Sequence, residues 1–265
     1  MPFPNFAGKQ REDAFFTPEE YVAYLRREGL LPQIAMPAGV ILCYRRGLLR
    51  RIGEREPLER VRGLPAEFSL LSETGGTVAI CGGFGIGAPA VTAVVEELIA
   101  LGVRRFVSIG TAGALQPEST LGEIIVCDRA IRDEGVSHHY LPPERYAHAS
   151  PGLSERLQAE LARLGGALST GATWTIDAPY RETTAEARYY QQEGVRAIDM
   201  EAAALFAVAA YRGVELAAAF VVSDSLADLV WQPSLRGPEV QAGLDRLYQA
   251  ARATLSGIRS DAEGL

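Results

Sequence analysis

The sequence is poor in the residues that usually bind metals or form cross-links: its 265 residues include 3 cysteines and 3 histidines. An odd number of cysteines with no zinc-type spacing excludes a simple disulfide framework or zinc site. Each cysteine follows an apolar run, which predicts small buried side chains in a reduced protein. No metal site is therefore expected. The cysteines and histidines are Cys43, Cys81, Cys127, His138, His139 and His148.

The sequence also lacks an excess of positive charge and a long apolar run. Lys and Arg number 26 against 33 Asp and Glu, a net charge of −7, so nucleic acid is not an expected partner. The N-terminus has no basic-then-apolar leader pattern. The apolar run at 202–211 is about half the length that a bilayer requires. We therefore expect a cytoplasmic protein without a membrane partner.

Short apolar runs alternate with helical patterns along most of the chain. This alternation predicts one α/β domain at 38–265, with a central, mostly parallel or mixed twisted sheet flanked by helices. We expect residues 1–37 to form an N-terminal arm with one short helix. The helix is predicted by TPEE at 17–20, which combines a capping pattern with Pro at the first helical position. Strands are expected at 40–43, 78–81, 106–109, 124–127, 171–176, 195–198 and 217–222. Helices are expected at 89–101, 152–164, 184–193, 200–212 and 239–255.

Two glycine-bearing segments follow predicted strands. The first is CGGFGIGAPA at 81–90, which contains Gly85 and Ile86. Either its glycines let backbone amides approach an anion, or they form a tight turn that serves packing. Its spacing also fits a dinucleotide fingerprint, but the next strand ends without the acid that such a site needs. The second, GTAGA at 110–114, adds a Thr hydroxyl to free amides. Loops at the carboxyl ends of neighbouring strands are where α/β sheets bind ligands.

Three carboxylates stand at element boundaries. Asp199 and Glu201 flank the start of an alanine-rich helix, where Asp199 is either a helix cap or a ligand. Glu201 enters an otherwise apolar helix and needs a polar partner, such as a pair of sugar hydroxyls. Asp224 ends the most apolar strand, where it is either a general acid or a loop-start residue that bonds its own backbone.

Taken together, these segments resemble the nucleoside phosphorylase and nucleosidase superfamily, which includes uridine phosphorylase, hexameric purine nucleoside phosphorylase and methylthioadenosine nucleosidase. The resemblance covers roughly 38–255 and follows a consistent order. It is carried by GIGAP at 85–89, EELIALGV at 96–103, IGTAGA at 109–114, GEIIV at 122–126, DMEAAA at 199–204 and VSD at 222–224.

The resemblance implies cleavage of an N-glycosidic bond, with phosphate or water attacking the anomeric carbon. It implies that Met200 and Glu201 hold the ribose and that Asp224 protonates the leaving base, which favours a purine. Thr111 matches a residue at the junction of phosphate and sugar, and Gly85 lies in the possible anion loop. The further substrate-binding residues that it implies are Asp199, Ala112, Gly113, Ser223, Tyr180, Arg181, Ile86 and His139.

Two departures concern the phosphate. The family's Gly-Asp-Pro-x-Arg loop after the first strand is absent, and Ser108 stands where many phosphorylases carry Arg. Arg45, Arg46 or Arg50 can substitute, since a guanidinium binds phosphate through two parallel hydrogen bonds. The alternative is a solvated helix face, in which case water is the nucleophile and the enzyme is a nucleosidase.

The sequence therefore predicts a pentosyltransferase, a nucleoside phosphorylase that prefers purine nucleosides. The resemblance implies no metal or organic cofactor, phosphate as co-substrate, and a homo-oligomer from a dimer up to a trimer of dimers. The alternatives are a nucleosidase, uridine phosphorylase specificity, and a nucleoside-binding protein without turnover. A dinucleotide-dependent oxidoreductase is a more distant alternative.

Overall fold

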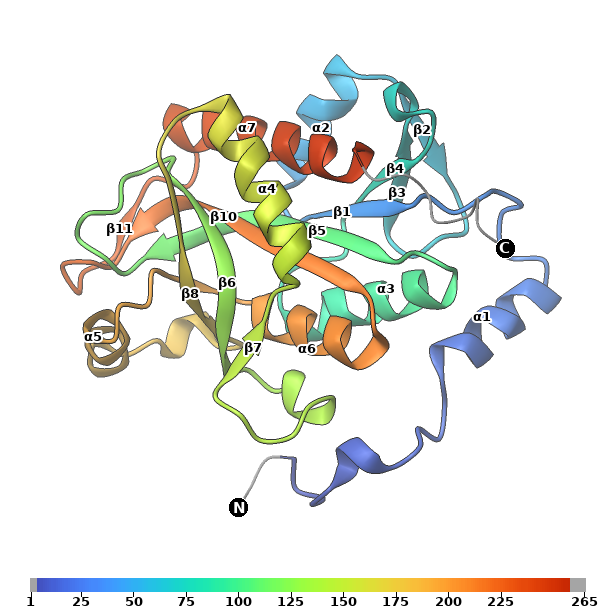
Figure 1. The fold of residues 1–265 in the computed structure, drawn as a ribbon, viewed down its shortest axis with the longest axis horizontal. Helices are drawn as coiled ribbons and strands as arrows, with labels where there is room; N and C mark the ends of the chain where they lie inside the picture. Colours follow the sequence, from blue (N-terminus) through green and yellow to red (C-terminus); the bar gives the residue numbers. More distant parts are fainter. Residues whose placement is uncertain (1–3, 258–265) are drawn as a thin grey trace.

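A computed structural model describes residues 4–257 of the chain, and in that part a central mixed sheet of eleven strands is flanked by helices (Figure 1). The predicted fold class is confirmed. Along the sheet the order is β11-β10-β6-β8-β9-β5-β1-β4-β3-β2, with β7 paired to β6. The strands are β1 Gly39–Cys43, β2 Leu58–Val61, β3 Glu67–Leu71, β4 Val78–Gly82, β5 Arg105–Ala114, β6 Ile124–Asp133, β7 Tyr146–His148, β8 Leu168–Ile176, β9 Ala197–Asp199, β10 Glu215–Ser225 and β11 Gln232–Pro233.

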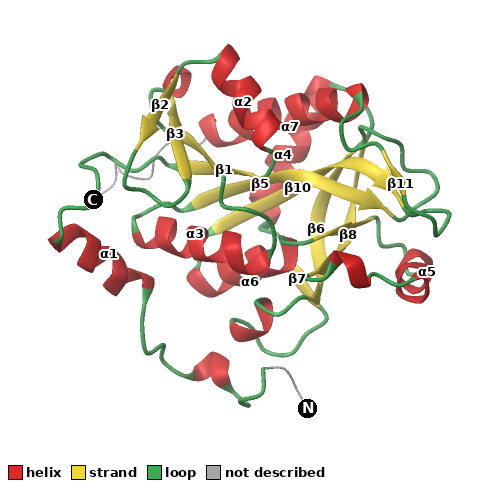
Figure 2. Cartoon of the chain, turned by 180° about the vertical axis from the view of Figure 1, so that it is seen from behind, coloured by secondary structure: helices red, strands yellow, loops and turns green. Residues whose placement is uncertain are grey.

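Helices cover both faces of the sheet, and alternate residues of the buried strands face opposite layers. In β1, Val40 and Leu42 belong to a core with α3 (Ala88–Ala100) and α6 (Ala202–Arg212). Ile41 and Cys43 belong to a core with α4 (Pro151–Leu164) and α7 (Pro238–Ser256). Both views place α3 and α6 on one face and α2, α4 and α7 on the other (Figures 1 and 2). The helices are α1 Pro18–Arg27, α2 Arg46–Arg55, α3 Ala88–Ala100, α4 Pro151–Leu164, α5 Thr184–Gln192, α6 Ala202–Arg212 and α7 Pro238–Ser256.

Five strands of the sheet close into a ring. β10 pairs with β6 and also with β5, while β6–β8, β8–β9 and β9–β5 pairings complete the circuit. A shift of register between Val222 and Asp224 gives β10 a bulge near its end. Bulges bend and twist a strand, which helps one strand to serve two neighbours. The sequence predicted a sheet but not this closure.

The GTAGA segment at 110–114 was expected to be a loop, and this expectation was wrong. β5 continues through it to Ala114, because its end pairs with β10 on one side and with Ile198 and Ala197 of β9 on the other. Gly and Ala have little intrinsic strand preference, so pairing with neighbours decides their conformation here. The segment therefore presents backbone and small side chains from a rigid strand.

The N-terminal arm contains the predicted helix. The side chains of Thr17 and Glu20 form the reciprocal capping box with each other's backbone at the start of α1. α1 packs against α3, and Lys9 and Gln10 contact the segment at His138 and His139. Residues 1–3 of the predicted arm and 258–265 of the predicted domain lie outside the described residues.

The three cysteines are buried and free, as the sequence predicted. Within residues 4–257, none of the helices combines the length and apolar character that crossing a bilayer requires.

Candidate active site

The carboxyl ends of β1, β5, β9 and β10 surround a cavity of about 290 Å³. β1, β5 and β10 run parallel, so their carboxyl ends meet at one edge of the sheet, and β9, which runs antiparallel to β5, pairs with β5 at Gly113 and Ala114. Ten of the residues predicted to bind substrate or phosphate line this cavity: Arg45, Ile86, Thr111, Ala112, Gly113, Asp199, Met200, Glu201, Ser223 and Asp224. Six further residues that were not predicted as site residues also line it: Tyr44, Gly110, Glu182, Ile198, Leu226 and Leu235.

Six predicted site residues do not line this cavity. Gly85 lies in the turn before α3, and Arg46 and Arg50 line a second cavity beside α7. His139 lies in a short 3₁₀ helix beneath the N-terminal arm, where it contacts Lys9. Tyr180 is 98% exposed, and Arg181 is exposed directly before the lining residue Glu182. Their predicted roles in binding stay predictions.

Glu201 is a buried carboxyl that a glycine amide fixes in the cavity wall. It is the N-cap residue of α6 and 6% exposed, and its Oε1 accepts the Gly87 N–H at 2.6 Å. Gly87 has φ +97, a conformation that favours glycine and that turns its amide toward Glu201. Burial raises the pKa of Glu201 to about 7, with a further contribution from the charge of Asp199, while the Gly87 hydrogen bond opposes the rise. Near neutral pH, Glu201 therefore exchanges between its protonated and its ionised form.

Asp199 performs the capping function that was one of its two predicted alternatives. Its Oδ1 accepts the N–H groups of Glu201 and Ala202 at 2.8 and 2.7 Å. Thr173 and Thr175 donate their hydroxyls to the same carboxylate. Burial raises the pKa of Asp199, and these hydrogen bonds counter the increase. Although Asp199 also lines the cavity, its oxygens are largely engaged in holding the start of α6.

Asp224 is held at the other end of the cavity by two donors. Ser223 Oγ donates to its Oδ1 at 2.7 Å, and Trp231 Nε1 donates to its Oδ2 at 2.9 Å. Gly113 makes room for this arrangement: a Cβ there would lie 3.0 Å from Asp224 Oδ2 and 2.7 Å from Leu226 Cδ1. The absence of a side chain at 113 thus lets the Asp224 carboxylate approach the β5 backbone.

Glu182 is a second carboxyl near Asp224. It is half-buried in the cavity wall, and its pKa is raised to about 7 by burial first and then by repulsion from Asp224 and Glu186. Its position was not predicted, because Glu182 lies in a polar loop segment where solvated carboxylates are common. The cavity therefore contains two carboxyl groups, Glu182 and Glu201, that exchange protons near neutral pH.

The loop after β1 brings a tyrosine rather than an Asp-Pro pair into the cavity. Tyr44 Oη lies 3.2 Å from Ser108 Oγ, and its ring meets Phe84 edge-on with centroids 5.2 Å apart. Burial raises the pKa of the Tyr44 phenol, so it stays a neutral hydrogen-bonding group. Arg45, the next residue, lines the cavity and donates to the Leu235 carbonyl at 2.9 Å.

Comparisons with known proteins agree with this architecture. The chain is 28% identical over 198 residues to a uridine phosphorylase of Haemophilus influenzae, spanning 69% of this chain and 78% of the relative. It is 32% identical over 146 residues to a DeoD-type purine nucleoside phosphorylase of Caldanaerobacter subterraneus, spanning 54% and 63%. The crystal structure of a uridine phosphorylase from Vibrio fischeri superposes with a TM-score of 0.73 at 28% identity, covering 85% of this chain and 93% of that one.

These relatives are nucleoside phosphorylases, which are pentosyltransferases. They include enzymes named for uridine and for purine nucleosides. The family model described as the phosphorylase superfamily matches residues 38–256, which contain every residue that lines the cavity. This chain belongs to the phosphorylase superfamily.

Proposed function

We propose that this protein is a nucleoside phosphorylase that cleaves purine nucleosides in preference to pyrimidine nucleosides. The observation that carries the proposal is the pairing of Glu201 and Asp224 in one cavity, at a site whose named relatives are nucleoside phosphorylases. Phosphate oxygen forms a bond to the anomeric carbon as the N-glycosidic bond breaks. The electron pair of that bond passes to the base, which leaves with a proton, and the products are free base and sugar 1-phosphate.

The ribose end of the reaction depends on Glu201. When ionised, its carboxylate accepts hydrogen bonds from the 2′ and 3′ hydroxyls, and Met200 packs beside the sugar. The Gly87 N–H holds the carboxylate in place before substrate binds. This fixed position supports catalysis, because a positioned group loses no conformational freedom in the transition state.

The base end of the reaction depends on Asp224. Its carboxyl delivers a proton to a ring nitrogen of the departing purine, a contribution on the order of 10²–10⁴ in rate. Trp231 must yield Oδ2 or share it when the base binds, because it now donates to that oxygen. Glu182, a second carboxyl in the cavity wall near Asp224, can accept a hydrogen bond from an N–H on the edge of the base.

Phosphate is assigned to Thr111 and Arg45, the predicted phosphate residues that line the cavity. The Thr111 hydroxyl and the Arg45 guanidinium are suitable donors to phosphate oxygens. Arg45 has to release the Leu235 carbonyl to bind phosphate fully. A nucleosidase is the second candidate, and Tyr44 favours it, because this neutral side chain, bonded to the buried Ser108, lines the cavity after β1, where the family's phosphate loop would hold an anion.

We further propose a cytoplasmic homo-oligomer that needs no metal or organic cofactor. The buried free cysteines support a reducing compartment. Light scattering tests the assembly, and full activity after dialysis against a chelator tests the cofactor.

The experiment is a panel of inosine, guanosine, adenosine, uridine and methylthioadenosine, each incubated with purified protein with and without phosphate. Chromatography measures the free base released. Phosphate-dependent release that is faster for a purine nucleoside supports the proposal. Equal release without phosphate establishes the nucleosidase, and faster uridine cleavage contradicts the purine preference. Asp224→Asn, purified in the same way, is the control. If it is inactive while the wild type is active, the activity belongs to this protein and not to a contaminating enzyme.

A further inference from the structure

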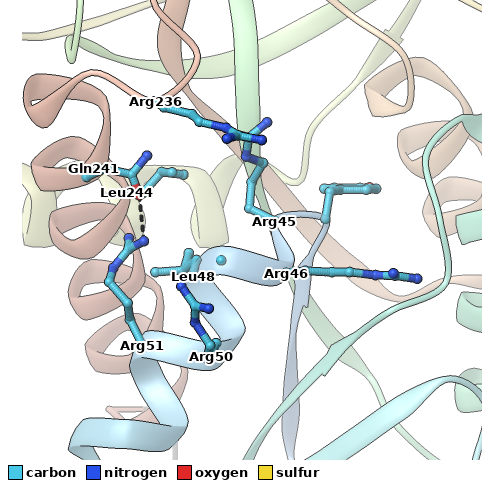
Figure 3. Close-up of a pocket in the computed structure, with 10 residues that line it drawn as sticks. Arg45, Arg46, Leu48, Arg50, Arg51, Arg236, Gln241 and Leu244 are labelled. Atoms are coloured by element: carbon cyan, nitrogen blue, oxygen red, sulfur yellow. Dashed lines mark hydrogen bonds between the residues drawn. The ribbon is translucent and has the colours of Figure 1, made fainter.

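A second, larger cavity adjoins the proposed substrate cavity. It encloses about 710 Å³ between α2 and the first turns of α7, and Tyr44 and Arg45 line both cavities. Figure 3 shows Arg45 and Arg236 reaching toward the same end of it, while Arg51 extends toward Gln241 of α7. Its wall contains five arginines: Arg45, Arg46, Arg50, Arg51 and Arg236.

Few negative charges balance these arginines. None of the described residues that line the cavity is Asp or Glu. Arg51 pairs with Asp245 at 2.7 Å, but Arg55 shares that carboxylate at the same distance. Arg50 has only an exposed partner, Glu54, at 3.8 Å. Arg236 forms no hydrogen bond or ion pair with any described residue.

This concentration of positive charge stands out on a chain with a net charge of −7. Like charges gathered in a concave surface repel one another and attract anions strongly, because the low-dielectric walls focus the field. α2 begins at the same cavity: Arg46, Gly47 and Leu48 of its first turn line it, and its N-cap residue Arg45 makes no side-chain capping bond. The positive end of the α2 dipole adds to the potential that the arginines create.

We propose that this arginine cavity binds a polyphosphate anion, with two or more linked phosphoryl groups, next to the substrate cavity. A single phosphate carries a charge of about −1.5 to −2, so most of the positive charge of the five guanidinium groups stays uncompensated. The cavity is also more than twice as large as the one assigned to nucleoside and phosphate. Both inorganic polyphosphate and the phosphate chain of a nucleoside triphosphate have the required chemistry.

Arg45 links this ligand to the neighbouring site. Its guanidinium donates to the carbonyl of Leu235, which lines the substrate cavity. A polyphosphate that draws Arg45 toward Arg236 removes that hydrogen bond and changes the wall of the substrate cavity. Binding at the two cavities is then coupled, and the coupling acts equally in both directions.

The test is isothermal titration calorimetry of the purified protein with tripolyphosphate, ATP and inorganic phosphate, all without metal. Arg50→Gln/Arg236→Gln is the test variant, because neither arginine lines the substrate cavity and both are exposed. Arg60→Gln/Arg62→Gln is the control, since it removes two exposed arginines from the β2 region. We expect saturable binding of tripolyphosphate that the test variant weakens by at least about tenfold and the control leaves unchanged.

Equal affinity for ATP and tripolyphosphate indicates that the phosphate chain alone is recognised, and tighter binding of ATP indicates a nucleotide; both support the proposal. Three results overturn it: no saturable binding of tripolyphosphate, equal weakening in both variants, or inorganic phosphate binding as tightly as tripolyphosphate. None of these readouts depends on turnover. The proposal of polyphosphate binding and the proposed function can therefore each fail without the other.

Discussion

Replacing Glu201 with Gln removes a buried ionisable group while preserving the shape of the side chain and an oxygen that can accept the Gly87 N–H. The pKa of Glu201 is about 7, against 4.5 for the unperturbed group. The folded protein therefore binds this proton more tightly than the unfolded chain does. As pH rises from below 4.5 to above 7, the wild type loses about 3 kcal/mol of stability that the variant does not lose.

The assay is urea unfolding of wild type and Glu201→Gln between pH 5 and pH 9. The difference in unfolding free energy should move in favour of the variant by roughly 2–3 kcal/mol across this range. Glu155→Gln, an exposed position on α4, serves as the control and should show no such trend. A pH-independent difference between wild type and Glu201→Gln would refute the reasoning, because it would mean that Glu201 titrates alike in both states.

The same variant should lose activity. Gln cannot supply the charge that strengthens hydrogen bonds to two sugar hydroxyls. Losing about 3 kcal/mol of this interaction energy would lower kcat/KM roughly a hundredfold. In the wild type, kcat/KM should rise with pH through about 7 as Glu201 ionises. A pH profile that is flat between 6 and 8 would contradict this assignment.

Three further predictions concern other positions. Asp224→Asn should lower kcat for a purine nucleoside by about 10²–10⁴ while nucleoside affinity, measured by calorimetry, changes little; an unchanged kcat would remove Asp224 from the mechanism. Gly113→Ala should lower kcat/KM by about a hundredfold, because the new Cβ displaces the Asp224 carboxylate or Leu226; wild-type kinetics would show that the site tolerates the methyl group. Arg212→Gln should reduce the unfolding free energy by about 3 kcal/mol, since it leaves Glu96, 7% exposed, without its partner at 2.7 Å; urea unfolding with equal midpoints would contradict that estimate.

Local patterns predicted the order of most helices and buried strands, because burial imposes a period on each segment independently of the rest. The capping box at Thr17 and Glu20 is one such local signal. Pairing between distant strands has no comparable signature. The closure of the ring through β10 depends on contacts with both β5 and β6, and the extension of β5 through 110–114 depends on β9 and β10. The β2–β3 hairpin was also missed.

The predicted site residues that converge are mainly those at strand ends, such as Thr111 and Asp224, since sheet topology brings these ends together. Glu182 and Trp231 come from loops, and only tertiary packing places them beside Asp224. The arginines show a third limit. Arg45 occupies the N-cap position of α2 and lines both cavities, whereas Arg46, the first residue of the helix, lines only the second cavity. A rotation of about 100° per helical residue separates neighbours that look equivalent in sequence.

The most direct test of nucleoside phosphorolysis is phosphorus NMR of the purified protein with inosine or guanosine and one equivalent of inorganic phosphate. The proposed reaction predicts that the inorganic phosphate signal is replaced by that of a sugar 1-phosphate, in step with release of free base. Release of base with the inorganic phosphate signal unchanged would contradict phosphorolysis and make water the nucleophile.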